Sequence, residues 1–378
     1  MCTPNNITFG VEFEFIVPQA AGVDSHPHDD RFYHTNRYVF EDGDVMGPVI
    51  VDCLKDVVPI VGSDDYKDSL YLANERGIKL EPGRAVPYSY FWKTSFEGSL
   101  QARPKEDVKG TYSYWQHPVE VSSRVLREHE FDEVARVYRQ LRTSVRINLN
   151  SSCSFHVHVG TAHLDLVGYQ KLATLIIVCE SFLWRCCETF RRDGWWCLSI
   201  SSYSRTARVR DQRKPSPMMH SLVPSSILAA ELRDSVRGIW AATSILELRD
   251  QLLVQWGGDC GDYDVRGGFY IRQSNEEDVY GEPCPTATAE FRYSHASGDA
   301  ERDHCFVRIC IALVKAAELN GPAYTAMIAS FAKGGDFSNF LDPLNLQELH
   351  TYCTAAESEY IGKGAEPAKP ATEFLPKV

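Results

Sequence analysis

Several segments of the chain alternate between apolar and polar residues, a pattern typical of β-strands that bury one face. The clearest case is ITFGVEFEFIV at residues 7–17, in which two glutamates stand between apolar residues. The segment SCSFHVHV at residues 152–159 has the same period of two. We predict strands at residues 7–17, 89–95, 118–126, 152–159, 269–273 and 286–293.

Other segments place apolar residues three and four positions apart, the spacing of helices that bury one face. The long apolar stretch at residues 166–190 is predicted to be a mostly buried helix. Residues 199–219 are rich in Arg, Ser and Pro, and this composition predicts a loop. The predicted helices are residues 48–58, 65–76, 128–145, 166–190, 225–236, 243–254, 301–319, 323–332 and 344–360.

The order of these elements lacks a regular strand–helix–strand rhythm, which favours an α+β fold over a doubly wound one. No internal repeat or long linker divides the chain, so we predict one catalytic domain at residues 1–361. The tail at residues 362–378 is rich in Lys, Ala and Pro and is predicted to be disordered.

The composition excludes some classes of partner. The chain has 378 residues, of which 44% are hydrophobic and 24% charged, as in an ordinary soluble enzyme. Its net charge of −12 argues against binding to nucleic acid or to an anionic membrane, which both require a basic surface. The 12 cysteines form no CxxC pair and the N-terminus has no signal-peptide pattern, so we expect a cytoplasmic protein. Nothing in the sequence indicates its oligomeric state.

Four of the predicted strands carry charged or imidazole side chains on one face, because residues two apart on a strand point to the same side. Such residues are about 6.5–7 Å apart along the strand, so neighbouring strands can together hold one ion or two adjacent ions. Taken singly, each pattern also fits a half-solvated antiparallel strand. The polar-face residues are Glu12, Glu14, Glu120, Ser122, His156, His158, Glu290 and Arg292.

Four glutamates in one concave site would repel one another and would be costly to desolvate unless cations neutralised them. Mg²⁺ and Mn²⁺ take oxygen ligands and bridge substrate phosphates, and Mn²⁺ accepts a histidine more readily. The sequence contains no GxxxxGK[ST], GxGxxG, HExxH or GxSxG motif. If ATP binds, a sheet and metal ions must therefore hold its phosphates.

The segment FGVEFEF at residues 9–15 resembles the first catalytic strand of the glutamine synthetase and glutamate–cysteine ligase superfamily. Within that superfamily the chain is most similar to the amidoligase family, whose later motifs are E(I/V)xSP, HxHV and EFR. Here they read EVSS at residues 120–123, HVHV at 156–159 and EFR at 290–292, and WKTSFEGSL at 92–100 is similar to a further family strand. The sequence departs from the family at Arg124, where Pro is usual, and at Glu97, where Asp is commoner.

This resemblance implies a curved antiparallel sheet of the glutamine synthetase type, with helices on its convex face and the active site on its concave face. It implies an ATP-dependent ligase that joins a small carboxylate to an amine through an acyl phosphate. Mg²⁺ or Mn²⁺ would be held by Glu12, Glu14, Glu120, His156 and Glu290.

The resemblance also implies roles for basic residues. Arg292 would contact the transferred phosphoryl group, and His158 would lie near the nucleotide phosphates or support His156. Arg205 would bind the substrate carboxylate or a phosphate, whereas the nearby Arg208, Arg210 and Arg213 fit a solvated charge run. Arg272, which precedes the last catalytic strand, is a further candidate for nucleotide binding. The roles of Glu97, Arg124 and residues 199–219 stay open.

Three other functions fit parts of the pattern. A phosphotransferase of the guanidino-kinase type would use the same scaffold and release a stable phosphorylated product. A non-catalytic nucleotide-binding protein would keep the sheet and lack the chemistry. A zinc hydrolase would use His156 and His158, but it lacks a clear third nitrogen or sulfur ligand and leaves the four glutamates unexplained.

Overall fold

The computed structural model describes residues 7–20, 26–33, 46–62, 69–75, 77–79, 90–100, 114–150, 152–186, 197–209, 213–254, 267–273, 287–360 and 374–378. The contacts within the chain divide it into two compact units. Unit 1 contains residues 1–4, 158–294 and 305–365, and unit 2 contains residues 5–157, 295–304 and 366–378. The single domain at residues 1–361 stays a prediction.

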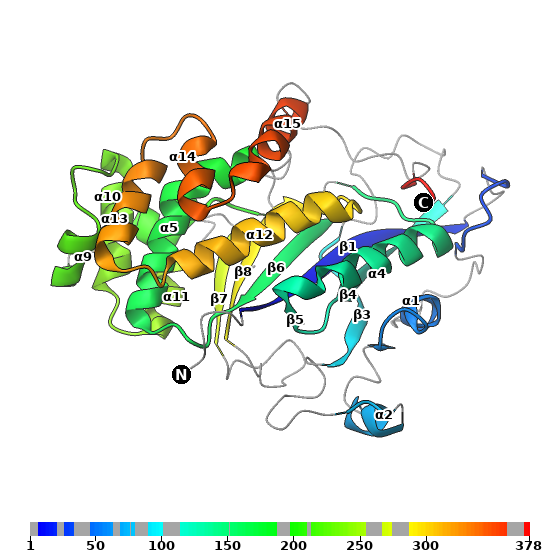
Figure 1. The fold of residues 1–378 in the computed structure, drawn as a ribbon. Helices are drawn as coiled ribbons and strands as arrows, with labels where there is room; N and C mark the ends of the chain where they lie inside the picture. The colour runs from blue at the N-terminus through cyan, green and yellow to red at the C-terminus, as the bar shows by residue number, and fades with distance from the viewer. Residues whose placement is uncertain are drawn as a thin grey trace. The chain divides into compact units, whose positions relative to one another are not determined.

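Unit 2 is built on the long strand β1 (Thr8–Ala20) and the strands beside it (Figure 1). The strand order is β2-β3-β4-β1, with β2 at Ile60–Gly62, β3 at Trp92–Phe96 and β4 at Tyr114–Ser122. β4 pairs antiparallel with both β1 and β3, whereas β2 pairs parallel with β3. The sheet is therefore open and mixed, and the antiparallel sheet implied by the family resemblance is wrong at β2.

The strand predicted at residues 118–126 is interrupted. β4 ends at Ser122 and β5 (Leu126–Arg127) pairs with the start of β1. Between them, the N–H of Val11 donates to Oγ of Ser123 at 2.8 Å, and the N–H of Ser123 donates to the carbonyl of Val11 at 2.7 Å. A side-chain oxygen thus replaces a backbone acceptor where the two strands separate.

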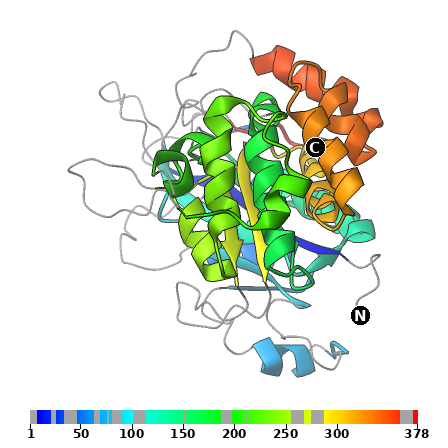
Figure 2. The same ribbon diagram turned by 90° about the vertical axis from the view of Figure 1, so that its left-hand side faces the viewer.

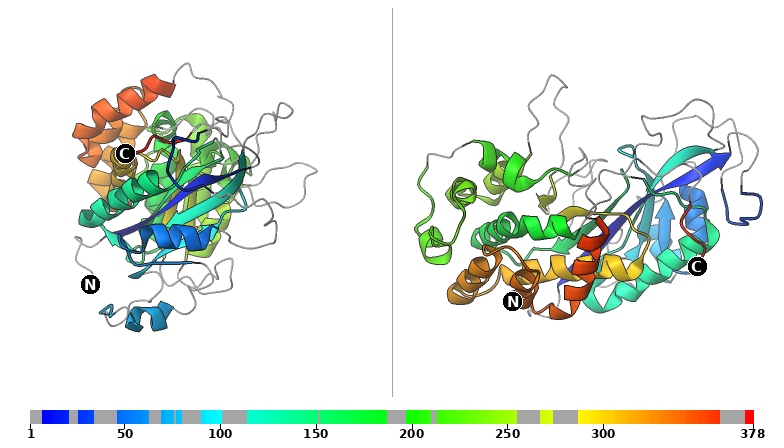
Figure 3. Two further views of the ribbon diagram at one scale, coloured as in Figure 1. Left: turned by 90° about the vertical axis from the view of Figure 1, so that its right-hand side faces the viewer. Right: turned by 90° about the horizontal axis from the view of Figure 1, so that it is seen from above.

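One face of β1 is apolar and packs against the helix α4 (Phe131–Ser144). The Phe13 and Tyr138 rings have centroids 4.6 Å apart, and those of Phe9 and Phe131 are 6.3 Å apart. Figures 1 and 3 show α4 running alongside β1. The helical spacing in residues 128–145 predicted this buried face correctly, and its members are Phe131, Val134, Val137, Tyr138 and Leu141. The polar side chains of β1 therefore face away from α4.

Two further helices of unit 2 were predicted from the sequence, at residues 48–58 and 65–76, and the structure has a helix in each region. α1 (Gly47–Leu54) contacts α4, and α2 is a short helix at Ser69–Glu75. At the end of the chain, residues 374–378 make defined contacts that the sequence did not predict. The N–H of Leu375 donates to the carbonyl of Ile147 at 2.7 Å, and its own carbonyl accepts from Arg31 at 2.7 Å.

Unit 1 places the strands β8 (Thr288–His295) and β7 (Phe269–Arg272) as an antiparallel pair, with β6 (Ser154–Gly160) next to β8. β6 runs across the boundary between the units. The 20-residue helix α5 (Leu166–Arg185) packs on β8 through Trp184 and Tyr293, whose rings lie 4.9 Å apart. Figure 2 shows the green helices of unit 1 in front of the yellow strands β7 and β8.

By length and composition, α5 is the one helix in the described part of the chain that could cross a membrane. Of its most apolar 18-residue window, 83% is buried inside the protein, as in the core helix of a globular unit. Its side chains therefore already have a protein environment. The remaining long helices are α10 (Ala230–Ala241), α11 (Ile245–Leu252), α12 (Ala300–Ala316), α13 (Gly321–Phe331) and α15 (His350–Tyr360).

The loop predicted at residues 199–219 is wrong in part, because three short helices lie in it. They are α7 (Ile200–Tyr203), α8 (Arg205–Arg208) and α9 (Pro217–Leu222). Ser204 and Ser216 cap α8 and α9, each accepting a backbone N–H with its side chain. Serine caps and a proline in the first turn are helix-start signals. Some of the Ser and Pro residues therefore mark the starts of helices, which the composition of the segment alone did not indicate.

Candidate active site

The polar face of unit 2 gathers acidic side chains from several strands. Glu14 on β1 lies directly opposite Glu120 on β4, and Glu120 lies opposite Ser95 on β3. Two residues along β1, on the same face, Glu12 lies opposite Ser122. Directly opposed residues on adjacent strands share a face of the sheet. The strand register therefore brings Glu12, Glu14 and Glu120 together, as the sequence predicted.

Three carboxylates converge at this face. Glu14, Glu97 and Glu120 each offer one oxygen, and the three oxygens all lie within 4.8 Å of one another. Glu97, whose role the sequence left open, follows the end of β3 and accepts the N–H of Ser99 at 2.9 Å. Glu120 accepts the hydroxyl of Ser122 at 2.7 Å. The cluster thus has a third acidic member that period-two alternation within the strands did not identify.

Glu14 is the most deeply buried carboxylate of the cluster, with 2% of the residue exposed. Its Oε2 atom is buried and has no hydrogen-bond partner among the residues that the structure describes. A buried carboxylate oxygen without a donor is costly. A divalent cation with oxygen preference would satisfy that oxygen, so the residues present fit Mg²⁺ or Mn²⁺.

The electrostatics of the cluster indicate the same need for positive charge. Burial raises the pKa of Glu120 well above its ordinary value, and the negative charges of Glu12, Glu97 and Glu14 raise it further. The three neighbouring glutamates therefore make ionisation of Glu120 less favourable. A cation bound beside Glu120 would oppose this effect, because positive charge favours the ionised form of that carboxylate.

His156 on β6 adds an imidazole to the same face. It is 1% exposed, and its Nδ1 lies 2.9 Å from Oε2 of Glu12. Its Nε2 lies 3.7 Å from Oε1 of Glu14. The contact with Glu12 orients the ring, as carboxylates commonly do for metal-ligating histidines. The structure thus brings together four of the five predicted metal ligands, Glu12, Glu14, Glu120 and His156, within unit 2.

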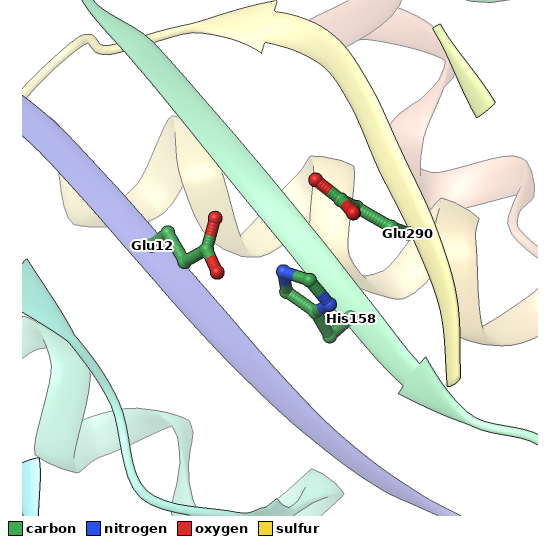
Figure 4. Close-up of side chains that lie close together, drawn as sticks. All are labelled: Glu12, His158 and Glu290. Carbon is green, nitrogen blue, oxygen red and sulfur yellow. The ribbon is translucent and has the colours of Figure 1, made fainter. Parts of the chain in front are cut away.

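The fifth predicted ligand, Glu290, belongs to unit 1 and to a different set of contacts. The side chains drawn in Figure 4 come from three strands, Glu12 from β1, His158 from β6 and Glu290 from β8. Within unit 1, a ring nitrogen of His158 and a carboxylate oxygen of Glu290 lie within 4.8 Å of one another. β6 and β8 therefore present these two side chains to each other.

Glu290 also accepts hydrogen bonds from two arginines. Nε of Arg272 donates to Oε2 of Glu290 at 2.9 Å, and Nη1 of Arg292 donates to Oε1. Glu290 is 2% exposed and the Arg292 side chain 6%, so this pair is buried, whereas Arg272 is partly exposed. The geometry therefore links Glu290, Arg272 and Arg292, all of which the sequence singled out, into one ion-paired group.

Arg205 begins the short helix α8 and its side chain is exposed. Its backbone N–H donates to the carbonyl of Leu253 at 2.9 Å, which fixes the start of the helix. Arg208 lies over the ring of Tyr203 at 4.9 Å, and Arg213 pairs with Glu247. These two arginines thus have contacts within unit 1, while Arg210 lies outside the described residues.

Arg124, where the family usually has Pro, forms ion pairs on the other side of the β4–β5 break. Its Nη2 lies 2.9 Å from Oε1 of Glu130 and 2.8 Å from Oε2 of Glu133. Glu133 also accepts the indole N–H of Trp92 at 2.7 Å. Arg124 therefore ties the turn after β4 to α4, which is a structural role.

A buried carboxylate outside the predicted site organises the region before Arg205. Glu180 on α5 is 2% exposed and accepts four hydrogen bonds. The hydroxyl of Tyr293 on β8 donates at 2.8 Å and that of Ser199 at 2.7 Å, and the N–H groups of Ile200 and Ser201 donate at 2.8 and 2.9 Å. Burial and the adjacent Glu180 charge raise the pKa of Tyr293, which keeps its hydroxyl protonated. A single acidic residue inside an apolar helix was the signal that could have identified Glu180.

Replacing Glu180 with glutamine is expected to destabilise the protein by roughly 3 kcal/mol, because one acceptor oxygen would become a donor facing two donors. Urea unfolding followed by circular dichroism measures this difference. Tyr293→Phe, which removes one of the four hydrogen bonds, should cost only about 1 kcal/mol. Equal stability of Glu180→Gln and the wild type would show that these contacts do not hold α7 in place.

Comparison with known proteins identifies a matching family model and a distant structural similarity to a solved protein. The chain is similar to a bifunctional glutathione synthetase from Pasteurella multocida at 10% sequence identity and a TM-score of 0.36. That alignment covers 95% of this chain and 47% of the other, so this chain spans about half the length of that protein. A likeness this distant carries no argument about function. No curated protein matches the chain.

The family evidence is stronger, and it covers the acidic face of unit 2. A family model described as "putative amidoligase enzyme" matches residues 5–222, more than half of the 378 residues. The match includes the strands that carry Glu12, Glu14, Glu120 and His156. The sequence-based resemblance to this family is thereby confirmed. The chain belongs to the amidoligase family.

Proposed function

We propose that the protein is an ATP-dependent carboxylate–amine ligase. The γ-phosphoryl group of ATP passes to a substrate carboxylate oxygen, which gives ADP and an acyl phosphate. An amine then attacks the acyl carbon, inorganic phosphate leaves, and the nitrogen loses a proton to give the amide. The observation that supports this proposal most directly is the convergence of Glu14, Glu97 and Glu120 in a chain of the amidoligase family.

Divalent metal ions are part of the proposal. Glu12, Glu14, Glu120, His156 and Glu290 are assigned as ligands, and the position of Glu97 adds it to this set. Bound Mg²⁺ or Mn²⁺ supplies positive charge that offsets the negative charge of the phosphates. The carboxylates would hold the ions, and the Glu12 carboxylate, which accepts from Nδ1 of His156, holds the imidazole ring in one orientation.

The basic residues are assigned to the anionic groups. Arg292 binds the transferred phosphoryl group, because its planar guanidinium matches phosphate oxygens in a bidentate manner. His158 and Arg272 bind the nucleotide phosphates, and Arg205 binds the substrate carboxylate or a phosphate.

The proposal includes the fold and the location of the protein. The sheet is of the curved glutamine synthetase type, and its concave face binds the substrates. The protein acts in the cytoplasm.

An assay of ADP formation tests this function. The purified protein is given ATP, Mg²⁺ or Mn²⁺, and a panel of small carboxylates and amines that includes amino acids and short peptides, and mass spectrometry identifies the products. We expect ADP release that depends on the metal, a carboxylate and an amine together, with an amide among the products. A stable phosphorylated product without an amide would instead identify a phosphotransferase. Absence of metal-dependent ATP binding would reject both enzymes.

A further inference from the structure

Lys93 lies on β3 in the same part of unit 2 as the acidic cluster. In the strand register it is directly opposite Ser122 on β4, and Ser122 is directly opposite Glu12 on β1. The next set of opposed residues on the same face is Ser95, Glu120 and Glu14. Lys93 is therefore one same-face position away from the pair of Glu14 and Glu120, and neither the alternation of glutamates nor the family motif at residues 92–100 gave Lys93 itself a role.

The contacts of its neighbours place Lys93 on the acidic face. Trp92 and Thr94 are completely buried, and the indole N–H of Trp92 donates to Oε1 of Glu133 on α4 at 2.7 Å. α4 packs on the apolar face of unit 2, so Trp92 points to that face. Successive residues of a strand point to opposite faces. Lys93 consequently points to the face that carries Glu12, Glu14 and Glu120.

The position is chemically unusual, because a lysine beside a metal-binding cluster opposes the binding of metal ions. Lys93 is half-buried, so its charge is less screened by water than that of a surface lysine. An ammonium group offers three donors and no acceptor, and it suits phosphate oxygens as a point charge. An anion that arrives together with the metal ions would benefit from this charge, whereas the ions alone would not.

We infer that Lys93 and the acidic face form a binding site for phosphoryl oxygens, in which the ammonium contacts a phosphoryl group that binds together with the metal ions the glutamates would hold. This inference rests on the proposed function and adds a residue to it. The phosphoryl group belongs either to the bound nucleotide or to the group that is transferred and then released as phosphate. A structural counter-ion would behave differently, because its loss would leave phosphate binding unchanged.

Lys93→Met is the test variant, since methionine keeps much of the apolar stem and removes the charge. Calorimetry on the full chain measures the binding of Mn²⁺ alone, of ADP with saturating Mn²⁺, and of inorganic phosphate with Mn²⁺ and ADP present. We expect Mn²⁺ to bind about threefold more tightly, because a nearby positive charge is removed. ADP, phosphate or both are expected to bind roughly tenfold more weakly, because a charge-assisted hydrogen bond is lost.

Two control variants make the result specific. Lys93→Arg keeps the positive charge and should retain most of the ADP and phosphate binding. Lys55→Met removes a surface lysine of the same unit that pairs with Asp52, and it should change none of the three affinities. Together they separate the loss of this charge from a general change in net charge.

The outcomes distinguish the two sources of the phosphoryl group and the alternatives. A loss confined to ADP assigns Lys93 to the nucleotide, and a loss confined to inorganic phosphate assigns it to the transferred group. Unchanged binding of both, or equal weakening of all three ligands that Lys93→Arg does not restore, would overturn the inference while leaving the proposed function intact. Failure of the wild type to bind Mn²⁺ and ADP would reject the proposed function itself.

Discussion

Replacing Glu14 with glutamine is expected to lower metal-dependent ADP formation by about 1,000-fold or more, since catalysis of phosphoryl transfer rests largely on positioned charge. Glu14 is buried, contributes an oxygen to the cluster with Glu97 and Glu120, and lies 3.7 Å from the His156 ring. Glutamine keeps the shape but removes the negative charge and one of the two oxygens. Metal binding should weaken together with turnover, and calorimetry with Mn²⁺ checks this independently of the substrates.

The stability of the Glu14→Gln variant separates this explanation from simple unfolding. Without metal, the variant is expected to be as stable as the wild type or more stable, because one of several mutually repelling buried carboxylates is gone. Urea unfolding in the presence of a chelator measures it. Glu75→Gln, at an exposed position on α2, is the matched control and should change neither activity nor stability. Wild-type turnover by Glu14→Gln would remove this residue from the metal site.

The periodic spacing of apolar residues predicted the longer helices and strands, in which that spacing repeats several times. The 13 residues of β1 and the 14 residues of α4 show several repeats each, and both were predicted close to their observed bounds. β2 has only three residues, Ile60–Gly62, and was not predicted, because so short a segment has no measurable period. Its parallel pairing with β3 depends on the path of the chain between them, which alternation does not encode.

In the candidate site, the sequence predicted the face of the strand on which a side chain lies, but it did not predict which residue of the neighbouring strand lies opposite. Alternation correctly placed Glu12 and Glu14 on one face of β1, but only the pairing of β1 with β4 sets Glu14 opposite Glu120. Glu97 lies just beyond the end of β3, so no strand period predicted that its carboxylate meets the other two. Residues from separate strands become neighbours through tertiary pairing, and a single sequence carries little information about that pairing.

The neighbours of single polar residues in short strands were the hardest to predict. Lys93 follows a buried tryptophan and precedes a buried threonine, so its polar character was hidden in a short strand without clear alternation. Arg272 was proposed on proximity in sequence alone, yet it donates to Glu290 from the adjacent strand. In both positions the strand pairing, and not the residue pattern, indicates which neighbours the side chain can serve.

Arg292→Lys is expected to lower the rate of ADP formation about 100-fold, with a smaller change in the KM for ATP. Arg292 is buried and donates to Glu290, so its guanidinium is held in one orientation before any substrate binds. A lysine ammonium is a point charge, and it cannot contact Glu290 and a phosphoryl oxygen with the same planar geometry. Steady-state kinetics with a substrate pair found in the ligase assay measures kcat and KM separately.

Arg272→Lys is the matched comparison, because Arg272 donates to the same carboxylate but is partly exposed. We expect it to lower kcat by less than tenfold, since exposure reduces the cost of an altered donor geometry. Both variants keep the charge, so a difference between them reflects geometry at Glu290 and not net charge. Wild-type kinetics in Arg292→Lys would exclude this residue from phosphoryl transfer, and its contact with Glu290 would then serve only to neutralise a buried carboxylate.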